Sequence, residues 1–222
     1  MIIPAFSVGR TQEIVYALNN FSNQHRLPKI DIYVDSPLAV NATTVFRMHP
    51  ECFNASFAAV LDKDPDPFGF DNLFYITRQE DSKKLNDHKK PCVIISASGM
   101  MEAGRVKHHL ANNISDPRNT VLVVGYCAPT TLGARIVRGD REVSIHGNVY
   151  EVKADVKKIE SYSGHGDYNE MMGFLDCQDK NALEKTFIVH GEYETQKKYA
   201  DTLTGAGFKN IEIPSRGEEY DI

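Results

Sequence analysis

The apolar positions of the first 61 residues follow first a helical and then an extended pattern. Apolar side chains recur with a 3.6-residue period at residues 14–21, which predicts an amphipathic helix, and Ser7 is placed to cap it. Residues 30–34 are typical of a short buried strand. Ser36 follows that strand as the expected cap of a second helical stretch, which has Pro37 in its first turn and ends near residue 61.

Strands and helices alternate in the middle of the chain. Pro65 and Pro67 end the preceding helical stretch. The pattern then predicts strands at residues 73–76, 93–96 and 120–124, and helices at residues 79–88, 105–110 and 132–137. Alternation of this kind favours an α/β fold in which crossover helices flank a parallel sheet.

The pattern changes after residue 141. Three short segments near a His146-Gly147 turn are expected to form antiparallel strands, and further helices and strands follow toward the end of the chain. The expected strands are at 142–144, 148–153, 157–161, 186–189 and 211–213, and the expected helices are near 170–175 and 193–203. We therefore predict two domains, 1–141 and 142–222.

Composition and charge exclude several classes of protein. The 222 residues carry a net charge of −5, which excludes a globally basic nucleic-acid binder. The four cysteines are too few and too dispersed for a disulfide framework, and no Cys-x-x-Cys pair supplies a zinc ribbon. No apolar run approaches the roughly 18 residues of a membrane span, so we expect no membrane partner and a cytoplasmic location.

The charge is unevenly distributed along the chain. Residues 1–104 sum to −2, residues 105–141 to +4 and residues 142–222 to −7. The positive stretch, which also contains His108 and His109, is the best candidate for an anionic ligand, and the alternative is that its charges never converge. Adjacent imidazoles on a helix point about 100° apart, so we expect one packed ring, one exposed ring and no shared metal.

Two histidines stand beside glycines at the ends of predicted strands. His165 lies in Ser163-Gly164-His165-Gly166-Asp167, and His190 lies in Val189-His190-Gly191-Glu192. Because α/β sheets build sites at the carboxyl ends of strands, either imidazole is placed to bind zinc or to act as a general acid or base. The alternative is that each histidine is structural. No phosphate loop, dinucleotide-binding motif or nucleophile elbow is present.

Three strand-to-helix turns offer backbone N–H groups and hydroxyls at helix N-termini, an arrangement that favours phosphate. The turns are Asp35-Ser36-Pro37, Ser96-Ala97-Ser98-Gly99-Met100 and Thr130-Thr131-Leu132-Gly133. One such turn is ordinary helix capping. Three on one parallel sheet, beside the positive stretch, predict a groove that follows a phosphate backbone.

A series of motifs runs through almost the whole chain. They are Ile3-Pro4-Ala5-Phe6-Ser7-Val8-Gly9-Arg10-Thr11-Gln12-Glu13, Asp35-Ser36-Pro37-Leu38-Ala39, Ser98-Gly99-Met100-Met101 with Gly104-Arg105, His108-His109-Leu110, Gly125-Tyr126, and Thr131-Leu132-Gly133. In this order they resemble the β-CASP domain of metallo-β-lactamase-superfamily nucleases, a family that includes the cleavage and polyadenylation specificity factor endonuclease and its prokaryotic relatives. Residues from about 153 onward resemble the RNA-metabolising tail of that family. The resemblance implies a β-CASP parallel sheet flanked by helices, followed by the C-terminal strands and helices of a metallo-β-lactamase αββα domain.

The resemblance also implies zinc-dependent hydrolysis of RNA phosphodiester bonds by a water held between two zinc ions. His165 would then face the scissile phosphate, Asp167 would orient it, and His190 would be a zinc ligand. Single-stranded RNA would run along the cleft between domains. The residues implied in RNA contact are Arg10, Ser36, Ser98, Gly99, Met100, Arg105, Thr131 and Arg135.

The chain departs from the family pattern in one large respect. The H-x-H-x-D-H zinc motif is absent from the 222 residues, and one histidine ligand cannot hold two zinc ions. We therefore expect the C-terminal part of a longer nuclease that lacks its N-terminal metallo-β-lactamase half, binds no stoichiometric zinc and does not cleave RNA alone. A homodimer is compatible with this interpretation. The alternatives are a non-catalytic RNA-binding or scaffold subunit, and a protein with two core histidines that binds only through its basic segment.

Overall fold

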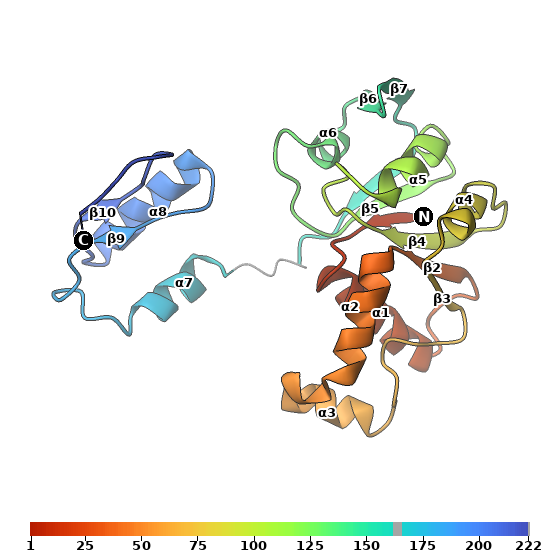
Figure 1. Cartoon of the computed structure of the whole chain (residues 1–222), viewed down its shortest axis with the longest axis horizontal. Coiled ribbons are helices and arrows are strands. Elements are labelled where there is room, and N and C mark those ends of the chain that lie inside the picture. The colour runs from red at the N-terminus through yellow and green to blue at the C-terminus, as the bar shows by residue number, and fades with distance from the viewer. Residues whose placement is uncertain (162–165, 222) are drawn as a thin grey trace. The chain divides into compact units, whose positions relative to one another are not determined.

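Six parallel strands form the sheet at the centre of the first part of the chain (Figure 1). The computed structural model describes residues 1–161 and 166–221, and internal contacts divide the chain into two compact units, 1–163 and 164–222. The strands of the first unit's sheet, in spatial order, are β3 (Leu73–Ile76), β2 (Asp31–Asp35), β4 (Cys92–Ser96), β1 (Ile2–Pro4), β5 (Thr120–Val123) and β8 (Asp155–Lys158). The predicted α/β fold with a parallel sheet is confirmed.

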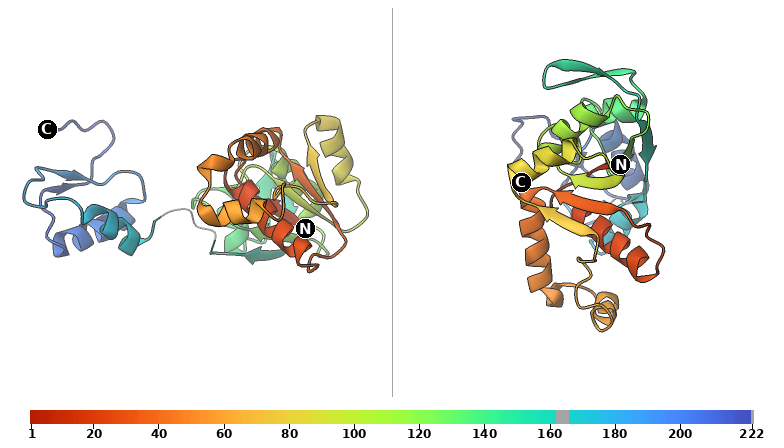
Figure 2. Two further views of the ribbon diagram at one scale, coloured as in Figure 1. Left: turned by 90° about the horizontal axis from the view of Figure 1, so that it is seen from below. Right: turned by 90° about the vertical axis from the view of Figure 1, so that its right-hand side faces the viewer.

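Helices connect the strands and cover both faces of the sheet (Figure 2). They are α1 (Arg10–Asn23), α2 (Pro37–Met48), a short 3-10 turn (Pro50–Cys52), α3 (Ala55–Leu61), α4 (Gln79–Asn86), α5 (Arg105–Asn113) and α6 (Leu132–Arg138). Within the described residues, no helix has the length and apolar character that crossing a membrane requires.

Successive residues of the central strands supply two separate hydrophobic cores. In β1, Ile2 packs in the core that contains residues of α5 and α6, whereas Ile3 packs in the core that contains residues of α1 and α2. In β5, Val121 and Val123 face the first of these cores, and Leu122 lies against the second. This two-residue alternation explains why the central strands read as continuous apolar runs, since both of their faces are buried.

Two helical predictions need correction. Ser7 does not cap the first helix: Gly9 is the N-cap of α1, with φ of 84°, and its N–H donates to the side chain of Gln12 at 2.8 Å. A positive φ suits glycine, and the side-chain oxygen of Gln12, three residues after the N-cap, satisfies the N–H of the N-cap residue. The helical stretch predicted to run to residue 61 is divided, because α2 ends at Met48 and Asn54 caps a separate α3.

The strands around residue 146 fall into two different sheets. β6 (Glu142–Ile145) and β7 (Asn148–Glu151) form the predicted antiparallel hairpin. The predicted antiparallel pairing of the following segment is wrong, because β8 pairs parallel with β5. The N–H groups of Lys153 and Ala154 both donate to Ile114 O, which directs the chain back to the sheet edge. β6, β7 and β8 thus belong to the first compact unit, beyond the predicted domain boundary at 141.

The second unit has a small core of its own. It contains α7 (Tyr168–Leu175), β9 (Thr186–Phe187), α8 (Tyr193–Gly205) and β10 (Ile211–Glu212), and β9 pairs parallel with β10. Ile188, Leu203 and Phe208 are buried at its centre. Both strands are shorter than predicted. β9 ends at Phe187 instead of residue 189, and Val189 is exposed, while β10 ends at Glu212 instead of residue 213.

Candidate nucleic-acid interface and metal ligand

Four turns meet at one edge of the six-stranded sheet. Strands β2, β4, β1 and β5 are neighbours and run parallel, so the turns that leave their carboxyl ends lie side by side. The turns after β2, β4, β1 and β5 lead into α2, α5, α1 and α6, respectively, and each helix begins at this edge. We call the surface formed by residues 5–9, 36–39, 97–104 and 124–133 the carboxyl edge. The three turns expected to bind phosphate all belong to it.

A buried glutamine joins the turns that precede α1 and α2. Gln12 is almost completely buried, and its amide N–H groups donate to Ser7 O at 3.2 Å, to Ala39 O at 3.2 Å and to Thr43 Oγ1 at 2.9 Å. The hydroxyls of Ser7 and Ser36 are 3.2 Å apart. Because every one of these groups would lose a partner if the turns separated, the two turns are held as one unit.

Ser36 caps α2, as predicted, and Thr131 caps α6. Ser36 Oγ accepts a hydrogen bond from the N–H of Ala39 at 3.3 Å, and Thr131 Oγ1 accepts one from Ala134 N–H at 3.3 Å. Both residues are nearly buried, so their hydroxyls serve the helix termini within the protein. Their predicted contact with RNA stays a prediction.

The Ser98-Gly99-Met100 turn packs against its neighbours on both sides. A Cβ atom on Gly99 would come within 3.0 Å of the Phe6 ring, so only glycine permits this approach. Met100 O accepts the N–H of Gly133 at 3.1 Å, which ties the turn to the start of α6. Ser98 Oγ accepts the N–H of Ala103 at 3.3 Å. The turn is therefore part of a single interlocked surface rather than a free loop.

Arg105 is engaged inside the protein. One of its guanidinium N–H groups donates to Asp35 Oδ1 at 2.6 Å and another donates to Thr77 O at 2.8 Å. The other carboxylate oxygen of Asp35 lies 2.6 Å from His109 Nε2 and accepts from the Ser82 hydroxyl at 2.5 Å. Arg105 thus anchors the start of α5 to the end of β2, and its predicted contact with RNA stays a prediction.

The same contacts set the charge state of Asp35. Burial alone would raise the pKa of this carboxyl, but hydrogen bonds from His109, Ser82 and Arg105 outweigh burial and hold the pKa below its usual value. His109 is completely buried and His108 is exposed, which confirms the prediction of one packed and one exposed ring. The structure therefore places a carboxylate, rather than a neutral acid, beneath the carboxyl edge.

The positive stretch 105–141 does not form one basic patch. Arg118 pairs with Asp116 at 2.6 Å and lies before β5, at the edge of the sheet opposite the turns. Arg135 and Arg138 both pair with Asp140, at 3.0 and 2.9 Å. Most of these charges are thus locally neutralised, as the alternative of scattered charges anticipated.

Arg10 lies at the first position of α1 and forms an ion pair with Glu13 one turn later on the same helix. Its side chain is largely covered. Of the predicted RNA-contacting arginines, Arg10, Arg105 and Arg135 therefore each have a carboxylate partner within the chain.

Two exposed aromatic rings on the carboxyl edge were not singled out from the sequence. Phe6 is 44% exposed and Tyr126 is 56% exposed, and they follow β1 and β5, which are neighbours in the sheet. Aromatic rings of this kind are platforms on which the bases of single-stranded RNA stack. The sequence did contain evidence that these rings are exposed. Each aromatic residue follows a buried strand, and neither fits the apolar spacing of the helix that comes next.

The second unit carries the remaining predicted site residues. His190 lies three residues after the end of β9, beyond buried Ile188 and exposed Val189, has φ of 62° and is itself exposed. Asp167 Oδ1 accepts the N–H of Glu170 at 2.9 Å, and Glu170 Oε2 accepts the N–H of Asp167 at 2.9 Å, so Asp167 caps α7. His165, predicted to be catalytic, lies outside the described residues.

The described residues do not complete a zinc site. Across 1–161 and 166–221, no group of three or more His, Cys, Asp or Glu side chains is arranged to hold a metal ion. His190 is a single exposed imidazole, whereas a zinc ion in a catalytic site takes three protein ligands. The donor set therefore does not fit zinc unless further ligands join His190.

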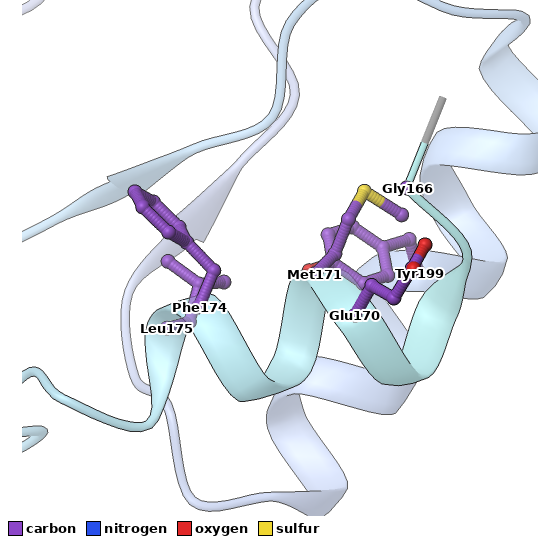
Figure 3. Close-up of a pocket in the computed structure, with 6 residues that line it drawn as sticks. All are labelled: Gly166, Glu170, Met171, Phe174, Leu175 and Tyr199. Atoms are coloured by element: carbon purple, nitrogen blue, oxygen red, sulfur yellow. The ribbon is translucent and has the colours of Figure 1, made fainter. Parts of the chain in front are cut away.

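A pocket in the second unit has the wrong chemistry for phosphate (Figure 3). It has a volume of about 330 Å³ and lies between α7 and α8, with Met171, Phe174, Leu175 and Tyr199 among its lining residues. Among the described residues that line it, Glu170 is the only charged one, and it is acidic. An anionic backbone would gain nothing there, so the pocket does not extend the candidate RNA interface.

Comparisons with known proteins agree with these features. Residues 11–136 match the Beta-Casp domain, and residues 149–214 match the Zn-dependent metallo-hydrolase RNA specificity domain. A ribonuclease of Thermus thermophilus is 35% identical over 87% of this chain and 43% of its own length, and an RNase J-like protein of Methanocaldococcus jannaschii is 33% identical over 97% and 47%. The transcription termination factor FttA of Methanosarcina mazei is 29% identical over 97% and 34%.

The chain spans less than half the length of these relatives. The Beta-Casp match nevertheless covers more than half of the chain, and it includes the turns that carry Ser36, Ser98 and Thr131. The resemblance found in the sequence is thereby confirmed, and the chain belongs to the β-CASP family of the metallo-β-lactamase superfamily.

Proposed function

We propose that the chain binds single-stranded RNA along the carboxyl edge and serves a zinc-dependent nuclease that hydrolyses RNA phosphodiester bonds. The observation that carries the proposal is the convergence of four helix N-termini and the exposed rings of Phe6 and Tyr126 on one surface. The match to an RNA specificity domain supports RNA as the ligand, and the similarity to a ribonuclease supports the reaction.

Two kinds of contact suit a single strand at this edge. Helix N-termini carry partial positive charge, so the starts of α1, α2 and α5 attract backbone phosphates. At the start of α6 the N–H of Leu132 already donates to the carboxylate of Glu102. Stacking of a base on an aromatic side chain contributes about 1–3 kcal/mol and tolerates any base. Binding is therefore expected to be weakly sequence-dependent. It needs no basic patch, in keeping with the paired arginines of residues 105–141.

For catalysis we propose that His190 is one ligand of a zinc site completed by groups outside the described residues. Zinc in such a site supplies a Lewis acid and an activated water. We assign His165 to face the scissile phosphate and Asp167 to orient it. Asp167 uses Oδ1 in the α7 cap, so its second oxygen is the one assigned to that contact. The chain alone is expected to bind no stoichiometric zinc.

The test is fluorescence anisotropy of a labelled single-stranded RNA 12-mer with the wild-type chain and with Phe6→Ala and Tyr126→Ala. Each loss of a stacking platform should weaken binding roughly 5- to 100-fold. Phe21→Ala is the matched control, because Phe21 is 40% exposed but lies near the end of α1, away from the carboxyl edge. Its affinity should equal that of the wild type.

Salt provides an independent measurement. Affinity should fall as salt rises, because bound phosphates release counterions. Equal affinities for the wild type and both edge variants, or an affinity unchanged between low and high salt, would refute RNA binding at this surface. Full RNA binding combined with no cleavage by the nuclease that contains this chain would favour the non-catalytic subunit instead.

A further inference from the structure

Two histidine rings stack on the first unit, outside the residues that form the carboxyl edge. His108 of α5 and His146 of the β6–β7 turn have ring centroids 4.5 Å apart and ring planes inclined by 26°. Both side chains are exposed. Neither residue has a part in the predicted RNA contacts or in the proposed catalytic groups.

The pair is held in place by the core beneath it. Ile145, which precedes His146, is completely buried, and it packs in the same core as Val106 and Leu110 of α5. The turn itself is a tight two-residue connection in which His146 and Gly147 both have positive φ. The two rings are therefore preorganised, and a ligand that bridges them does not have to order the hairpin first.

Two lysines lie close enough to His108 for their charge to lower its pKa. Lys107 precedes His108 on α5, and Lys83 lies on α4 three residues before Asn86. Asn86 Oδ1 is 2.9 Å from His109 Nδ1, so α4 packs beside α5 at this point. Residues three apart share a helix face, so Lys83 lies on the side of α4 that faces α5.

The local charge favours an anion over a metal cation. Desolvation, followed by the positive charge of His146, His109, Lys83 and Lys107, lowers the pKa of His108. His109 differs from the other three groups because its ring is bonded to the buried carboxylate of Asp35. Crowded positive groups repel a metal ion, and stacked imidazoles do not aim two lone pairs at one point. A bound anion would relieve the repulsion and favour protonated rings.

We propose that His108, His146, Lys83 and Lys107 form a second phosphate-binding site, which holds the backbone of an RNA strand as it leaves the carboxyl edge along α5. The inference rests on the proposed function for its ligand. His108 is four residues after Gly104, the N-cap of α5, which places it roughly 6 Å along the helix from that edge. A strand bound at the edge thus reaches the pair within about one nucleotide.

The chemistry predicts a specific pH dependence. The imidazolium forms of the two rings donate charge-assisted hydrogen bonds to a phosphate, and binding stabilises those forms. Affinity therefore rises as pH falls through the histidine pKa. Each proton taken up on binding strengthens affinity by at most about tenfold per pH unit.

The experiment compares the wild-type chain with His108→Gln/His146→Asn. Asparagine tolerates the left-handed backbone of residue 146, where φ is 51°. His49→Gln/His25→Asn is the matched control. His25 has a φ of 56°, close to that of His146, and both His25 and His49 are exposed at other places on the first unit. The probes are a single-stranded RNA 12-mer followed by anisotropy and inorganic pyrophosphate followed by imidazole Cε1–H NMR shifts, each at pH 6 and pH 8.

Wild type and control should bind RNA about three- to tenfold more tightly at pH 6 than at pH 8, and the double variant should lose that gain. Pyrophosphate should shift the His108 and His146 signals and leave His25 unchanged. An undiminished pH gain in the double variant, or equal shifts at His25, would overturn the site. Absent RNA binding at both pH values, with pyrophosphate still shifting His108 and His146, would refute the proposed function while supporting a site for free phosphate.

Discussion

Asp35 and His109 form a hydrogen bond of 2.6 Å with both side chains wholly excluded from solvent. Asp35 ends β2 and His109 lies in α5, so the contact fastens a helix to the carboxyl end of a strand 74 residues earlier in the chain. Arg105 binds the second carboxylate oxygen. The turns of the carboxyl edge thus rest on a buried, fully bonded carboxylate, and its removal should loosen the surface above it.

Replacement of that carboxylate is therefore expected to be costly. Asp35→Asn removes the negative charge and presents an N–H to donors, which should lower the free energy of unfolding by about 3–5 kcal/mol. Urea denaturation followed by circular dichroism measures the change. Asp116→Asn is the control, because the Asp116–Arg118 pair is exposed and its loss should leave the urea midpoint unchanged. Equal midpoints for all three proteins would contradict a structural role for Asp35.

The depressed pKa of Asp35 makes stability depend on acid. In the unfolded chain the carboxyl has a pKa of about 3.9, so on acidification the unfolded state takes up the proton first. The stabilisation is fully present above that pH and is lost as pH falls through the lower folded-state pKa. Thermal unfolding from pH 7 to pH 2.5 should show the wild type converging on Asp35→Asn below about pH 4. A constant gap across this range would show that folding does not change the pKa of Asp35, and would contradict a depressed folded-state pKa.

The close approach of Phe6 to Gly99 offers a test that separates geometry from stability. Gly99→Ala places a methyl group 3.0 Å from the ring, so the ring must move. We expect RNA affinity to fall about as far as in Phe6→Ala, with unfolding only slightly easier. In Gly104→Ala the new Cβ clashes with Ala97 O and φ is +79°, so stability should drop by about 1–3 kcal/mol. Anisotropy and urea denaturation of both variants distinguish the two effects.

Local chemistry explains which parts of the fold could be predicted. The cap Ser36 and the division of His108 and His109 into one packed and one exposed ring followed from residue type and spacing, because a helix terminus and a helix face are local features. The pairing of β8 with β5 did not, since it depends on contacts with Ile114 that no local pattern records. The partners of Arg105 were also inaccessible, because they lie on β2 and after β3.

The candidate site shows the same division. The sequence placed three turns on one parallel sheet, and topology alone brings them to one edge. The net charge counted along the chain was a poor guide to the location of a basic surface. Arg135 and Arg138 are both neutralised by Asp140, and only the turn after α6 brings Asp140 within reach of them. Phe6 and Tyr126 emerged only when their exposure was known.

The cap of α7 provides the last prediction. Asp167 and Glu170 exchange hydrogen bonds between side chain and backbone, so Asp167→Ala should destabilise the start of α7 by about 1 kcal/mol. Asp167→Ser keeps a capping oxygen and should preserve the helix. Amide hydrogen exchange of residues 168–175 measures both, with Asp176→Ala as a control beyond the end of the helix. Equal exchange in Asp167→Ala and wild type would show that the cap contributes nothing, and loss of protection in Asp167→Ser would show that the carboxylate itself is needed.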